Sequence, residues 1–71
     1  MTDTRLLKKR IEESGFKISF IAKKLGLSSY GFALKRDNKS EFTASEINSL
    51  CNLLNIDADG MMDIFFAEKV E

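Results

Sequence analysis

The sequence predicts an all-α fold of five short helices, and three observations lead to that prediction. The 71 residues contain no proline and only four glycines, so few positions interrupt a helix. Apolar residues recur at helical spacing, most clearly at Ile47, Leu50, Cys51 and Leu54. Residues that commonly cap helices stand before most of the expected helices. We expect one compact domain, residues 1–71, with a small core.

The first helix is expected over residues 4–14. Thr2 or Asp3 is its expected N-cap, and Gly15 is expected to end it in the left-handed conformation common at helix ends. Phe16, the next residue, is then expected to pack inward against the core.

The second helix, expected over residues 18–25, leads into the layout of a helix-turn-helix motif. Ala22 is small, as the crossing point of two closely packed helices requires. Gly26 follows four residues later and can take the left-handed backbone that a sharp bend needs. Leu27 is expected to enter the core, and Ser28 to cap the next helix. In such motifs the second helix of the pair is presented to the major groove of DNA.

The third and fourth helices are separated by a polar loop. The third is expected over residues 29–36. The fourth is the most clearly marked of the five, because Thr43 and Glu46 have the spacing of a capping box. Asn55 is expected to end it, since asparagine tolerates the left-handed backbone.

The fifth helix is expected to begin after Asp57, a good N-cap, and it carries more apolar residues than one face can bury. One stripe, Met61, Ile64 and Phe65, is expected to close the core. The residues left over predict a homodimer, because exposed apolar patches usually mark interaction surfaces. The expected dimer-interface residues are Met62, Phe66 and Val70.

Charge is distributed unevenly along a chain that is neutral overall. Residues 1–40 carry ten basic and four acidic residues, a net charge of +6. Residues 41–71 carry one basic and seven acidic residues, a net charge of −6. The basic half contains the helix-turn-helix layout, and this coincidence favours binding to the phosphates of double-stranded DNA.

Other chemistry is sparsely represented. The chain has no histidine, and its one cysteine, Cys51, lies on an apolar stripe and is expected in the core. We therefore expect no enzyme, no cofactor, no metal site and no small-molecule substrate. A single cysteine without a CxxC motif is typical of a reducing compartment, and no apolar run is long enough to span a membrane, so a cytoplasmic protein is expected.

These features together resemble the lambda-repressor-like DNA-binding domains of phage repressors, Cro-type proteins and small bacterial regulators. The residues that carry the resemblance are Phe16, Ile21, Ala22, Leu25, Gly26, Leu27, Ser28, Phe32 and the segment 50–56. The resemblance implies a compact five-helix domain with the helix-turn-helix as helices 2 and 3. It also implies a sequence-selective transcriptional regulator of phage or prophage type, with residues 28–36 in the major groove. A protein-interaction adapter on the same scaffold, antitoxin-like or antirepressor-like, is the alternative.

The resemblance assigns the site residues by their position in the motif. The expected base-contacting residues are Ser28, Ser29, Tyr30 and Leu34. The expected phosphate-contacting residues are Lys17, Ser19, Lys35, Arg36, Asn38 and Lys39. Each of three residues also has an alternative role. Ser28 acts only as an N-cap, or Tyr30 is a half-buried packing residue. The third helix rotates slightly so that Leu34 is buried instead of facing DNA. The alternative for Leu34 is considered because Lys35 stands at a position where the family usually has an apolar residue.

Overall fold

The computed structural model describes residues 1–68 and confirms an all-helical fold, with no strand in that range. The helices are α1 (Thr4–Ser14), α2 (Ile18–Lys24), α3 (Ser29–Arg36), α4 (Ala44–Leu54) and α5 (Ala58–Phe65). The predicted bounds agree with these to within one residue, the difference being that Leu25 is the C-cap of α2 rather than its last residue.

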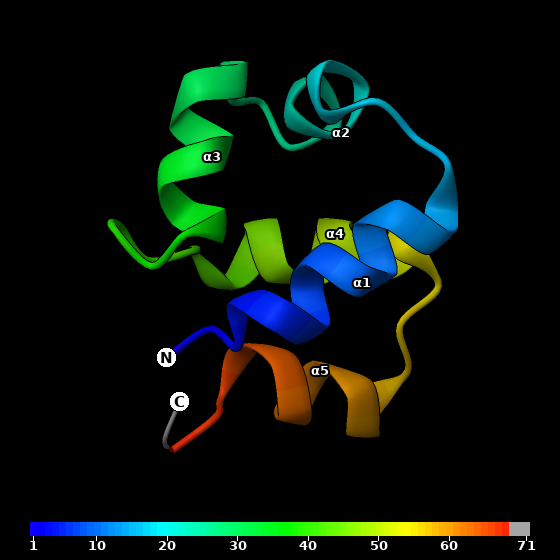
Figure 1. Cartoon of the computed structure of the whole chain (residues 1–71), viewed down its shortest axis with the longest axis vertical. Coiled ribbons are helices and arrows are strands. Elements are labelled where there is room, and N and C mark those ends of the chain that lie inside the picture. The colour runs from blue at the N-terminus through cyan, green and yellow to red at the C-terminus, as the bar shows by residue number, and fades with distance from the viewer. Residues whose placement is uncertain (69–71) are drawn as a thin grey trace.

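The helices form three levels along the longest axis of the molecule (Figure 1). α2 and α3 lie at one end, α1 and α4 cross the middle, and α5 lies at the other end. α1 contacts α3, α4 and α5, while α4 contacts α1, α2 and α5. The two middle helices therefore support the α2–α3 pair on one side and α5 on the other.

The core takes its central side chains from four helices. Leu7, Ile21, Phe32 and Leu50, one each from α1 to α4, are fully buried. Ile64 and Phe65 of α5 are buried against the other side of the core, which confirms the predicted inward stripe of that helix. Cys51 of α4 is also buried, as expected. Burying a side chain of this size contributes about 1.5–3 kcal/mol. The fold thus depends on a small number of large apolar groups.

Phe42, in the loop between α3 and α4, joins the two ends of the core. Its ring lies 5.9 Å from that of Phe32 and 5.5 Å from that of Phe65, both in edge-on arrangements. Such aromatic pairs contribute about 0.5–1.5 kcal/mol beyond the area that they bury. The loop residue therefore connects α3 with α5, two helices that do not otherwise contact each other in the described chain.

The predicted helix caps are present. Asp3, rather than Thr2, caps α1 by accepting hydrogen bonds from the amides of Arg5 and Leu6, and Gly15 ends the helix with φ of 73°. Asp57 caps α5 in the same way. Asn55 ends α4 with φ of 58°, also as predicted.

One packing prediction is wrong. Phe16 does not enter the core: its side chain is 39% exposed, and its ring stacks on that of Phe20 at 5.1 Å. Ile18 and Ile21 supply the core-facing positions of this segment, so no inward space remains for Phe16. The result is an exposed aromatic pair made by Phe20 of α2 and Phe16 in the segment before it.

The capping box that begins α4 also binds α3. Glu46 Oε1 accepts a hydrogen bond from the Thr43 amide at 2.9 Å, as predicted, and a second from Lys35 Nζ at 2.6 Å. The side chains of Lys35 and Glu46 are only 15% and 12% exposed. Burial raises the pKa of the Glu46 carboxyl, but hydrogen bonds from Lys35 and Thr43 outweigh burial and hold that pKa below its ordinary value.

We expect Glu46→Gln to lower the free energy of unfolding by about 1–2 kcal/mol at pH 7, because the charge that binds Lys35 is lost. The pKa of Glu46 is lower in the folded chain than in the unfolded one. The stabilisation by the ionised Glu46 carboxylate is therefore present above pH 4.5, the ordinary pKa of a glutamate. It is lost as the pH falls from 4.5 through the lower pKa that Glu46 has in the folded chain. Urea denaturation at several pH values should show the two proteins converging in acid.

Glu41→Gln is the matched control, because it removes the same charge from an exposed loop residue without an ion pair in the described chain. It should leave stability nearly unchanged at pH 7. A loss in Glu46→Gln that persists undiminished at low pH would contradict the role of the ionised carboxylate.

Candidate nucleic-acid interface

A glycine turn holds α2 and α3 together. Gly26 adopts φ of 75° at the end of α2. Its amide donates to the Lys23 carbonyl at 3.1 Å, and the Leu27 amide donates to the Ala22 carbonyl at 2.9 Å. These two bonds form a Schellman motif, which reverses the chain with its backbone groups satisfied. Ala22 is buried at the crossing, as the sequence predicts, and α3 therefore starts close beside α2.

The start of α3 is fixed by Ser28. Its Oγ accepts a hydrogen bond from the Gly31 amide at 3.0 Å, so the predicted N-cap is present. A Cβ on Gly31 would lie only 3.1 Å from that oxygen, which explains why a glycine suits the first turn of this helix. The hydroxyl of Ser28 keeps its own proton to donate outward.

The first turn of α3 presents its next two side chains to solvent. Ser29 is exposed, and Tyr30 is 75% exposed, the highest value among the large apolar side chains of residues 1–68. The alternative that Tyr30 is a half-buried packing residue is therefore wrong. An exposed phenol at this place has its ring and its hydroxyl free for a partner.

Lys35, and not Leu34, occupies the inward-facing position near the end of α3. Leu34 is only partly buried and is not among the side chains that pack on the core cluster. Lys35 instead points inward, with its ammonium on Glu46. The helix is not rotated to bury Leu34, which remains at the edge of the exposed surface. The ion pair counts against Lys35 as a phosphate contact.

Arg36 is also engaged within the molecule. Its Nε and Nη2 donate to the two carboxylate oxygens of Asp37, both at 3.0 Å. These hydrogen bonds raise the pKa of Arg36 and lower the pKa of Asp37. Lys8 Nζ lies 3.5 Å from the same carboxylate. The charge of Arg36 is therefore paired within the molecule, and two of its five N–H donors are engaged, which counts against its predicted phosphate contact.

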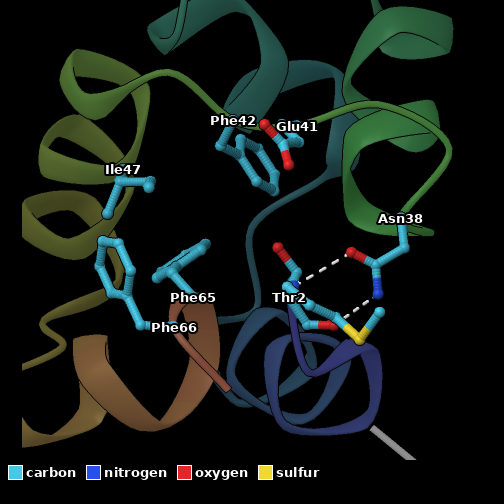
Figure 2. Close-up of a pocket in the computed structure, with 8 residues that line it drawn as sticks. Thr2, Asn38, Glu41, Phe42, Ile47, Phe65 and Phe66 are labelled. Atoms are coloured by element: carbon cyan, nitrogen blue, oxygen red, sulfur yellow. Dashed lines mark hydrogen bonds between the residues drawn. The ribbon is translucent and has the colours of Figure 1, made fainter. Parts of the chain in front are cut away.

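Asn38 has a structural role that the sequence prediction missed. It ends α3 with φ of 64°, and its side chain pairs with the backbone of Thr2 (Figure 2). Its Oδ1 accepts from the Thr2 amide at 3.1 Å, and its Nδ2 donates to the Thr2 carbonyl at 2.6 Å. The predicted phosphate contact would have to compete with both bonds. The left-handed asparagine was a detectable signal, but its partner lies 36 residues away.

Three predicted phosphate-contacting residues remain available. Lys17, Ser19 and Lys39 are exposed, and neither lysine forms an ion pair within residues 1–68. Sequence analysis did not select Lys23 and Lys24, which are also exposed and lie in the last turn of α2. Their position opposite the buried face of α2 was the signal that could have identified them.

The predicted dimer residues are exposed where the structure describes them. Met62 is 55% exposed and Phe66 is 52% exposed. Val70 lies outside the described residues. The division of α5 into an inward and an outward stripe is thus confirmed, while the homodimer stays a prediction.

Among residues 1–68, no cluster of histidine, cysteine, aspartate or glutamate has the geometry to hold a metal ion. None of the helices there has the length and hydrophobicity to cross a bilayer. A hollow of about 340 Å³ lies between the N-terminus, Asn38, Phe42 and the end of α5 (Figure 2). Its lining includes the N-terminal residue Met1 and the carboxylate of Glu41.

We expect Gly26→Ala to destabilise the chain by about 1–2 kcal/mol, because a Cβ disfavours the left-handed backbone. No atom lies within 4 Å of the position that the Cβ would occupy, so the cost is conformational rather than steric. Gly26→Asn should cost less, since asparagine tolerates this conformation. Thermal unfolding of both variants measures the difference, and equal losses would contradict the conformational origin.

Comparisons with protein-family models, with curated proteins and with solved structures gave no match to this chain.

Proposed function

We propose that the chain is a sequence-selective DNA-binding transcriptional regulator, lambda-repressor-like and of phage or prophage type. The observation that carries the proposal is the α2–turn–α3 unit. Two short helices are joined by a Schellman turn at Gly26, and the first turn of the second helix is capped and exposed. In helix-turn-helix proteins this part of the second helix contacts base edges in the major groove.

The placement of charge supports the same orientation. Exposed lysines lie on α2, at one end of the molecule, and in the loop after α3, at the level of α4, whereas α5 and its acidic residues lie at the other end (Figure 1). An electrostatic field of this kind attracts the polyanion to the α2–α3 end. The amino end of α3 adds the positive end of a helix dipole.

The proposal divides the site residues into two groups. Ser29 and Tyr30 read bases, with Ser28 donating its free hydroxyl proton and Leu34 at the edge of the contact. Lys17, Ser19 and Lys39 bind phosphates, together with Lys23 or Lys24. Base contacts specify the sequence, and phosphate contacts fix the position of the protein on the duplex. Lys35, Arg36 and Asn38 support α3 from within rather than binding DNA.

A protein-interaction adapter is the second candidate function. The observation that favours it is the internal engagement of Lys35, Arg36 and Asn38, which reduces the number of side chains free to bind DNA. The exposed Phe16 and Phe20 rings also suit a protein partner. Selection of bound sites from random duplex DNA separates the two functions, because the regulator should enrich one sequence and an adapter should enrich none.

We expect Lys39→Ala and Lys17→Ala to weaken binding to every DNA sequence to a similar extent. Each lost phosphate contact should reduce the slope of log K against log salt by about 1, since one fewer counterion is released. Lys9→Ala is the matched control, because it removes the same charge from exposed α1. Fluorescence anisotropy over a salt series measures the slopes. Slopes that change equally in all three variants would refute a localised phosphate site.

We expect Tyr30→Ala to cost about 1–3 kcal/mol on a site selected from random DNA and little on non-specific DNA. The melting temperature should hardly change, because this side chain is mainly in solvent. Tyr30→Phe separates the hydroxyl, which can bond a base edge, from the ring, which can contact a thymine methyl. A loss of equal size on specific and non-specific DNA would show that Tyr30 does not read bases.

A further inference from the structure

Two exposed surfaces of opposite charge lie on α2 and α5, the helices at opposite ends of the molecule (Figure 1). The α5 acidic face consists of Asp59, Met62, Asp63 and Phe66, all of them exposed. The α2 basic face consists of Phe20, Lys23 and Lys24 of α2 together with Phe16, two residues before the helix, also all exposed. Each face joins two large apolar side chains with two charges of a single sign.

The α5 acidic face is poorly suited to pair with a copy of itself. Its residues follow the spacing i, i+3, i+4 and i+7, so carboxylates and apolar groups share one side of the helix. Residues 57–68 include no lysine or arginine. Asp63 borders a hollow with Lys9 and Arg10 but forms no ion pair within the described chain. A two-fold contact through this face would bring four carboxylates together, and like charges at an interface disfavour the pairing.

The α2 basic face has the complementary composition. The Phe16 and Phe20 rings lie 5.1 Å apart, and Lys24 Nζ lies 5.4 Å from the centroid of the Phe20 ring. No acidic residue occurs between positions 16 and 36. The face therefore offers an apolar centre beside cations, the counterpart of Met62 and Phe66 beside Asp59 and Asp63.

We infer that copies of this chain associate head to tail, with the α5 acidic face of one copy on the α2 basic face of the next. The charge complementarity of the two faces within one neutral chain identifies a second copy as the occupant. Because the two faces lie at opposite ends, each bound pair leaves one face of each kind free. Such a heterologous contact propagates into short arrays instead of closing as a two-fold dimer.

The association is weak and depends on salt. Each face is one helix wide, so the contact lies at the small end of specific interfaces. Its charges are exposed, and added salt screens them. The inference concerns the protein in solution. A copy bound on the α2 basic face would compete with the phosphate contacts proposed for Lys23 or Lys24.

Two variants, one on each face, test the inference: Phe20→Glu and Phe66→Lys. Sedimentation velocity at high micromolar concentration and low salt should show dimers and larger species for the unaltered chain. Each variant alone should be monomeric under the same conditions, with the dissociation constant raised at least about tenfold. An equimolar mixture should form a dimer and stop there, because one intact face of each kind remains. This recovery in the mixture is specific to a head-to-tail contact.

A second pair of variants guards against misfolding, with Lys24→Glu and Asp63→Lys on the two faces. These should behave like the first pair, and the doubly substituted chain should regain association because the charges are exchanged. Circular dichroism checks that each variant stays helical. An unaltered chain that remains monomeric overturns the inference. The inference is also overturned if Phe20→Glu still dimerises while Phe66→Lys does not, because that result would indicate a symmetric α5 dimer. A mixture of the two variants that stays monomeric overturns it as well.

Discussion

The anchoring of α3 along its inner side is the constraint on which the rest of the structure depends. Phe32 is fully buried, Lys35 binds the glutamate that caps α4, and Asn38 pairs with the backbone of Thr2. These three groups hold α3 to the core, to α4 and to the N-terminal segment in turn. Because every anchor lies on one side, the opposite side of the first turn, with Ser29 and Tyr30, is left to solvent.

The parts of the fold that sequence analysis predicted are those determined by neighbouring residues. Caps such as Thr43 with Glu46, and left-handed ends such as Gly15 and Asn55, act over three or four positions, so their meaning can be read locally. The inward stripe of α5 follows from the period of the helix in the same way. Helix bounds and the placement of the core were therefore accessible without a structure.

The candidate site was predicted less well, because long polar side chains find distant partners. Lys35 reaches Glu46 across 11 positions, and Asn38 reaches Thr2 across 36. No local pattern encodes these pairings, so both residues were expected to bind phosphates. Phe16 shows the complementary case, in which an apolar residue lies outside because Ile18 and Ile21 already occupy the inward positions.

The internal ion pairs also change how the charge of the chain should be interpreted. The basic half has a net charge of +6, yet Lys35, Arg36, Lys8 and Arg10 each lie against a carboxylate. The cations left unpaired around the α2–α3 unit are lysines, which act as point charges rather than as planar bidentate donors. Under the proposed function, a site composed of lysines, serines and one tyrosine would hold DNA by its phosphates and read bases through few contacts.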